Sequence, residues 1–142
     1  MTAEGPVIAA VSGGHMDAPV ITAAALFARH ERRPLLVLHV IEVGHSQALG
    51  ARDPGRAASA TRIVSEAQAL LPRNGISVRS DVVQARAAGP AIVERAAVDG
   101  AAAIVLGAHR FLGDAECDLG FTATYVLRHA TMPVTLCYDP IR

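Results

Sequence analysis

The 142-residue sequence has no tryptophan, and aromatic residues make up only 4% of it. Because platforms for stacking single-stranded bases are built from aromatic side chains, this scarcity argues against that kind of nucleic-acid binding. The formal net charge at pH 7 is zero, so the chain lacks the charge that attracts proteins to nucleic acid or to anionic lipid. We therefore expect no nucleic-acid partner and no membrane partner.

Long apolar runs and cysteine are also scarce. No apolar run approaches the ~20 residues that a membrane-spanning helix needs, and the N-terminal MTAEGPVIAAV lacks the basic segment that opens a signal peptide. Two cysteines, Cys117 and Cys137, do not make a disulfide framework and are expected to be reduced thiols. These features favour a cytoplasmic location.

Apolar residues are abundant, at 51% of the chain against 18% charged residues, which excludes a disordered protein. The length fits one domain, residues 1–142. A chain of this size buries roughly two-thirds of its extended surface when it folds, so it needs no disulfide or metal for stability.

Short apolar runs alternate with segments of helical spacing. The runs predict strands at residues 6–11, 35–40, 76–83, 103–106 and 134–137. Helices are predicted from Asp17 (as N-cap) to about residue 30, over 57–71, from Gly89-Pro90 (with proline at the first helical position) to just before Gly100, and over 122–129. The apolar faces of the first three helices are expected to include Leu26, Leu70 and Ala97, respectively.

Strands that alternate with helices predict an α/β fold with a parallel sheet covered on both faces. Right-handed crossovers favour a doubly wound, five-stranded sheet of order 3-2-1-4-5, with the polar-alternating strand at 76–83 on an edge. In that order the winding reverses between the first and fourth strands, where ligands bind outside the carboxyl ends. The loops 12–17 and 107–122 are expected to meet there.

The string IVLGAHR…GFTATYVLRHATMPVTLCY, together with the order of elements, resembles the universal stress protein family, whose fold is Rossmann-like and similar to that of the adenine nucleotide alpha hydrolases. The resemblance covers essentially the whole chain. The run ARAAG at residues 85–89 is similar to the universal stress domains that accompany some amino-acid transporters. The start at Met1 and the short tail after Tyr138 favour a free-standing domain instead.

The resemblance implies a site for an adenine nucleotide, ATP or AMP, with magnesium only as the nucleotide's companion. Members that bind ATP carry glycine, two residues, glycine, nine residues, glycine and then serine or threonine. This chain keeps the spacing and the outer glycines, Gly107 and Gly120, but has Arg110 and Phe121 at the other two positions. The resemblance places these four residues and Thr122 at the phosphate end, and it places Ser12, Gly13 and Val40 at the base and ribose end.

The departures from the motif leave two hypotheses open. Arg110 could fill the phosphate channel or offer its guanidinium fork to a phosphate. Phe121 donates no hydroxyl hydrogen bond, although Thr122 could cap the helix. Ser12 stands where ATP-binding members tend to have aspartate, and it is a weaker partner for a ribose or base. The chain is therefore either a regulatory protein that binds a small ligand, with no required turnover, or a dimeric interaction module whose pocket is closed.

Three other groups of residues suggest a metal site, a hydrolase pair and a dimer interface, on weaker sequence evidence. Histidine is a competent zinc ligand, and His15, His39, His45 and His109 all fall near strand carboxyl ends, but no tight spacing supports a metal site. Ser12 with His15 or His109 is the only pair that could serve a weak nucleotide hydrolase. The last strand is predicted to be an exposed edge, which invites a second copy to pair through Val134, Leu136 and Tyr138. The resemblance implies the same homodimer, and a regulatory protein partner is also expected.

Overall fold

The computed structural model describes residues 5–73, 75–109 and 119–139. In these residues strands and helices alternate: β1 (Val7–Ala10), α1 (Asp17–Glu31), β2 (Leu35–Glu42), α2 (Pro54–Ala69), β3 (Val78–Ala85), α3 (Ala88–Asp99), β4 (Ala103–His109), α4 (Phe121–His129) and β5 (Val134–Asp139). The strands form one five-stranded parallel sheet in the order β3-β2-β1-β4-β5. This confirms the predicted fold class and strand order.

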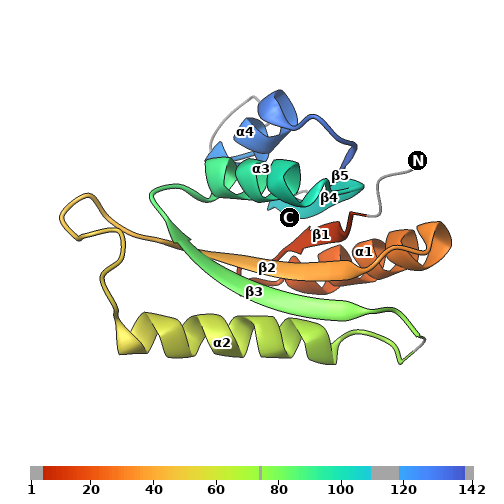
Figure 1. Ribbon diagram of the computed structural model, residues 1–142, viewed down its shortest axis with the longest axis horizontal. Coiled ribbons are helices and arrows are strands. Elements are labelled where there is room, and N and C mark those ends of the chain that lie inside the picture. Colours follow the sequence, from red (N-terminus) through yellow and green to blue (C-terminus); the bar gives the residue numbers. More distant parts are fainter. Residues whose placement is uncertain (1–4, 74, 110–118, 140–142) are drawn as a thin grey trace.

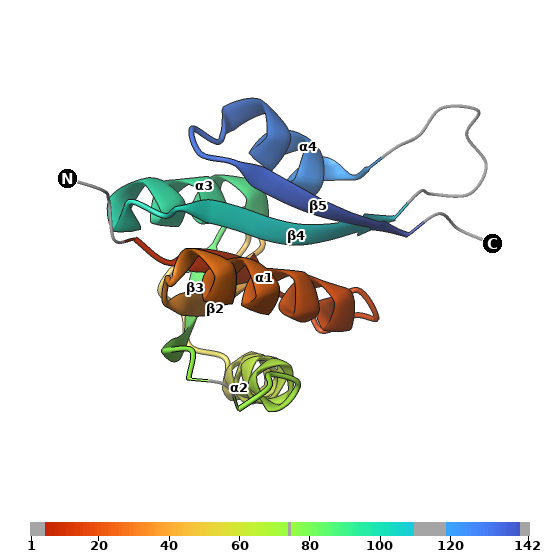
Figure 2. The same cartoon turned by 90° about the vertical axis from the view of Figure 1, so that its right-hand side faces the viewer.

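Helices cover both faces of the sheet, with α1 and α2 on one side and α3 and α4 on the other (Figures 1 and 2). Successive residues of β1 therefore pack into two different hydrophobic cores, one on each face of the sheet. Val7 and Ala9 pack with residues of α1 and α2, whereas Ile8 packs with residues of α3 and α4, and all three are fully buried. Burial on both sides explains why the central strands read as continuous apolar runs rather than as alternating ones.

The winding of the chain reverses at β1. Val7 pairs with Leu35 of β2 on one side and with Ala103 of β4 on the other. The helix that follows β1 packs on one face of the sheet, and the helix that follows β4 packs on the opposite face. The connections after β1 and β4 therefore diverge, which leaves room for a crevice at their carboxyl ends.

Several predicted boundaries were wrong. Helix α2 begins at Pro54, because Asp53 is its N-cap and accepts hydrogen bonds from the amides of Gly55 (3.0 Å) and Arg56 (3.3 Å). Helix α3 begins at Ala88, so Pro90 is its third residue rather than its first, while Gly100 ends it in the left-handed conformation as expected. Strands β2, β4 and β5 run two or three residues beyond the predicted ends, since their parallel partners continue beside them.

Three residues predicted to lie on buried helical faces are exposed. Leu26 is 63% exposed, because the buried face of α1 is made by other residues, including Val20, Ala24 and Ala28. Leu70, 54% exposed, lies just past the last helical residue of α2. Ala97 is exposed because Ile92 and Ala96 define the inward face of α3.

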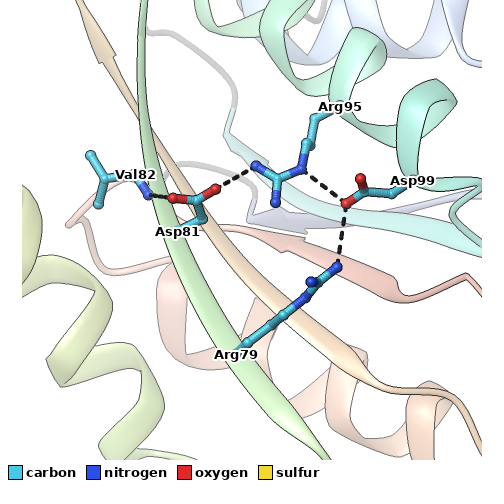
Figure 3. Close-up of polar contacts among 5 residues, drawn as sticks. All are labelled: Arg79, Asp81, Val82, Arg95 and Asp99. Atoms are coloured by element: carbon cyan, nitrogen blue, oxygen red, sulfur yellow. Dashed lines mark hydrogen bonds and ion pairs between the residues drawn. The ribbon is translucent and has the colours of Figure 1, made fainter.

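Strand β3 lies at an edge of the sheet and carries the wet face that its polar alternation predicted. Arg95 of α3 donates hydrogen bonds to Asp81 of β3 (2.6 Å) and to Asp99 (2.9 Å), as Figure 3 shows. Asp99 also lies 3.6 Å from the guanidinium of Arg79. The hydrogen bond to Asp81 is the main cause that raises the pKa of Arg95 above its usual value. This network joins the C-terminal half of α3 to the edge strand.

Candidate functional site

A cavity of about 320 Å³ opens at the carboxyl ends of β1, β2 and β4, where the predicted crevice should be. The starts of α1, α3 and α4 complete its wall. Its lining residues are Ala10, Val11, Ser12, Gly14, His15, Met16, Asp17, Val20, Leu38, His39, Val40, Glu42, Ala88, Ile92, Leu106, Gly107 and Thr122. The volume is at the lower end of the range that small-molecule sites occupy, about 300–1,000 Å³.

The structure brings together four of the residues that the sequence assigned to a binding site: Ser12, Val40, Gly107 and Thr122 all line the cavity. Gly13 lies between the lining residues Ser12 and Gly14, and Gly120 lies two residues before Thr122, but neither glycine is part of the wall.

Phe121 and Arg110 are the two residues expected to decide whether the pocket is open. Phe121 does not line the cavity, and its side chain is 96% exposed, so it does not plug the crevice. Arg110 lies outside the described residues.

The carboxylate of Asp17 has a different role from the predicted one. The N-cap position of α1 is Met16, which makes no side-chain capping bond. Asp17 instead accepts hydrogen bonds from the amides of Ser12 (2.9 Å) and Gly13 (2.7 Å). The chain's own carboxylate thus occupies the backbone donors that follow β1 and leaves a negative charge beside them. A phosphate group is therefore disfavoured at this end of the cavity.

Gly107 is a strand residue paired with Cys137, and it lies where α1 approaches the sheet. A Cβ at this position would be 2.7 Å from Cβ of Met16 and 3.4 Å from Cγ2 of Val20. The absence of a side chain therefore lets the start of α1 lie against β4. The resemblance places this glycine at the phosphate end of the site. The structure gives it a packing role as well as a place in the cavity wall.

Gly120 sets the start of α4. Its φ of 86° and ψ of 167° belong to a region that is essentially restricted to glycine. The first backbone bond of the helix runs from the amide of Thr124 to the carbonyl of Gly120 (3.1 Å). The amides before Thr124 have no acceptor within the helix and form its positive end. Since Thr122 lies in the cavity wall, this end of the cavity is the one that favours an anion.

Two further polar side chains shape the wall near β2. Nδ1 of His39 lies 2.8 Å from the carbonyl oxygen of Val11, and because a carbonyl only accepts, Nδ1 carries the hydrogen. This half-buried histidine thereby ties β2 to the end of β1. Glu42 accepts a hydrogen bond from the amide of Ala88 (3.1 Å) and so caps α3, whose own N-cap residue, Ala87, makes no such bond.

Sequence reasoning missed Glu42 because the predicted strand ended before it. It also missed Asp139, whose carboxylate lies 3.1 Å from Nε2 of His15 across the rim. Both residues are the last of their strands, β2 and β5, which run past the apolar residues that mark them in the sequence. The length of the neighbouring parallel strands was the only signal that could have included them.

The histidines and Ser12 considered as metal ligands or as a hydrolase pair lie near this rim of the sheet. Across the described ranges no group of three or more His, Cys, Asp or Glu side chains is placed to hold a metal ion. Nε2 of His15 lies 3.1 Å from a carboxylate oxygen of Asp139. Cys137 is partly buried, and its burial raises the pKa of its thiol. The predicted loop residue Cys117 and the side chain of His109 lie outside the described residues.

No helix in the described part of the chain has the length and apolar character needed to cross a bilayer.

Known proteins resemble this chain in both sequence and structure. The model of the universal stress protein family matches residues 5–137. A search of curated proteins finds no match. A universal stress protein from Archaeoglobus fulgidus superposes with a TM-score of 0.78 at 23% identity, over 93% of this chain and 97% of that one. The structure of the Archaeoglobus fulgidus protein in complex with dAMP gives 0.75 at 23% identity, over 95% and 98%.

A more distant relative shares the fold at lower identity. A universal stress protein family protein from Arabidopsis thaliana, solved with AMP bound, gives a TM-score of 0.61 at 12% identity, over 95% of this chain and 92% of that one. The family model spans nearly the whole chain. The protein belongs to the universal stress protein family.

Proposed function

We propose that this protein is a regulatory small-ligand binder whose cavity between β1 and β4 takes an adenine mononucleotide such as AMP. The observation that carries the proposal is the cavity itself, which lies at the reversal of the sheet with the positive end of α4 in its wall. Structurally similar members of the family have been solved with dAMP and with AMP.

The described residues of the cavity wall favour a ligand with few phosphate groups. Asp17 and Glu42 contribute two carboxylates, and no arginine is among the described residues that line the cavity. A triphosphate would bring several negative charges close to these carboxylates, at a cost that grows in a cavity of low dielectric constant. One phosphate at the start of α4, beside Thr122, keeps its charge near the helix amides instead.

The base and sugar have apolar and polar contacts available at the other end. Leu38 and Val40 offer apolar surface to an adenine ring, and the Ser12 hydroxyl can donate to or accept from a sugar or base. The carboxylate of Asp17 is an acceptor for a ribose hydroxyl while it holds the amides of Ser12 and Gly13.

Isothermal titration calorimetry with AMP, ADP, ATP and cyclic AMP tests this function. We expect micromolar binding that is strongest for a monophosphate and is lost in Gly120→Ala, which disturbs the start of α4. Gly50→Ala is the matched control, because a Cβ there meets nothing within 4 Å. Silence with every nucleotide would reject the proposal, and phosphate release in the same samples would point to the weak hydrolase.

The second candidate function is that of a dimeric interaction module, a homodimer formed through β5, and a separate observation supports it. Strand β5 is an edge strand, and Tyr138 on it is 39% exposed. Unpaired strand edges recruit further strands, including a second copy of the same one. Sedimentation velocity should show a dimer that Tyr138→Arg weakens and that Leu127→Arg, at an exposed position on α4, leaves intact. A monomeric wild type, or equal loss in both variants, would contradict the dimer.

A further inference from the structure

A second cavity, of about 370 Å³, lies at the opposite end of the sheet from the first. It is formed where α1 ends and where β2 and β3 begin. Three arginines, Arg29, Arg32 and Arg33, line it together with Gly75 and Ser77. We call it the arginine cavity.

The positive charges of the arginine cavity have no acidic partner within the described residues. The arginines that form ion pairs in the described part of the chain are Arg56, Arg79 and Arg95. The adjacent Glu31 is exposed and takes part in none of these pairs. The C-terminal end of α1 favours cations through the helix dipole. That field stabilises the charge of a guanidinium, but it supplies no hydrogen-bond acceptor to a particular nitrogen.

One guanidinium nitrogen of Arg33, a residue that lines this cavity, lacks a partner. Nη1 of Arg33 is buried and makes no hydrogen bond in the described part of the chain. Buried charged donors are normally satisfied, because leaving one unpaired forfeits the hydrogen bonds that water would have made. An anion bound in the arginine cavity would provide such an acceptor once the Arg33 side chain turned toward it.

The backbone conformation of Arg32 also supports a role for its side chain in binding. Its φ of 55° and ψ of 48° place it in the left-handed region at the end of α1, a position that usually belongs to glycine. Among the described residues it is the one non-glycine residue with positive φ. The chain therefore carries an arginine side chain at a position where glycine would fit the backbone better.

We propose that the arginine cavity binds the diphosphate group of a small anion, either free pyrophosphate or the diphosphate of a nucleotide. Guanidinium forks match phosphate oxygens in pairs, and three of them suit a ligand with several negative charges. The volume lies within the range of small-molecule sites, about 300–1,000 Å³.

Calorimetry with pyrophosphate, ADP and orthophosphate at constant ionic strength tests the proposal, with NMR to locate each ligand. We expect saturable pyrophosphate binding that shifts the amides of Arg32, Arg33 and Ser77. Tighter binding of ADP with the same shifts would identify a nucleotide as the source of the diphosphate, and binding of pyrophosphate alone would identify the free anion. No saturation by either ligand, or shifts confined to Ser12, Gly107 and Thr122, would overturn the proposal.

The decisive variant is Arg32→Gly, because it removes a guanidinium while giving the left-handed position its preferred residue. It should fold at least as stably as the wild type and bind pyrophosphate at least about tenfold more weakly, as expected for the loss of a charge-assisted hydrogen bond. The matched control is Arg62→Gln, at an exposed arginine of α2 that lines neither cavity. Equal weakening in the two variants would mean that only the overall charge matters, and would overturn the proposal.

Discussion

Replacing Gly107 with alanine is expected to destabilise the protein, although alanine is ordinarily the better residue in a strand. Glycine in a strand interior costs roughly 0.5–1 kcal/mol relative to alanine, so backbone entropy alone predicts a gain. The structure predicts a loss, because the new Cβ would lie 2.7 Å from Cβ of Met16.

The size of the loss follows from what can move. A Cβ is fixed by its own backbone, so Met16 cannot rotate away, and the start of α1 must shift as a unit. Overpacking of this kind costs typically about 1–3 kcal/mol. After the entropic gain is subtracted, we expect a net loss of about 0.5–2 kcal/mol in the free energy of unfolding. For a chain of this length that corresponds to a fall in Tm of about 2–7 °C.

Urea unfolding of a double-mutant cycle isolates the contact. Met16→Gly removes the opposing Cβ, so Gly107→Ala should cost much less in that background than in the wild type. Gly50→Ala serves as the control, since nothing lies within 4 Å of a Cβ there, and it should be neutral or slightly stabilising. A Gly107→Ala protein as stable as the wild type, or an equal loss in both backgrounds, would refute the reasoning.

Two further substitutions and one labelling experiment have expected outcomes. Gly120→Ala forces an alanine into a glycine-only backbone region and should lower the unfolding free energy by about 1–3 kcal/mol in urea; an unchanged midpoint would contradict this. Arg95→Met breaks the network between α3 and β3 and should destabilise by about 1–2 kcal/mol, whereas Arg62→Gln should not. Burial raises the pKa of the Cys137 thiol, so less of it is thiolate at neutral pH. In a Cys117→Ser background, iodoacetamide should label Cys137 more slowly in the folded than in the unfolded protein, with a rate that rises with pH; equal rates would contradict this.

The strand order was predictable because the central strands are buried on both faces. Residues such as Ile8 and Leu36 leave no polar alternation, so their runs stand out in the sequence and imply parallel pairing. The position of the cavity followed from that order together with the rule that ligands bind where the winding reverses. Both conclusions rest on the continuous apolar runs, and these runs exist because the central strands are buried on both faces.

Details decided by single hydrogen bonds were not predictable in the same way. Asp17 was expected to cap α1, but two amides at the end of β1 compete for its carboxylate and hold it. The Asp53-Pro54 pair is a recognisable helix start, yet the glycine and proline residues around it suggested a longer loop. The outward position of Phe121 depends on how Gly120 turns the chain, which the motif spacing does not specify.

The most direct test of the account is an NMR titration of the ¹⁵N-labelled protein with AMP. The account predicts saturable shifts of the amides of Ser12, Val40, Gly107 and Thr122, which lie on separate elements but share one cavity wall. The amides of Arg33 and Ser77, at the other end of the sheet, should stay in place. An unchanged spectrum at millimolar AMP, or shifts only at that other end, would contradict a nucleotide site between β1 and β4.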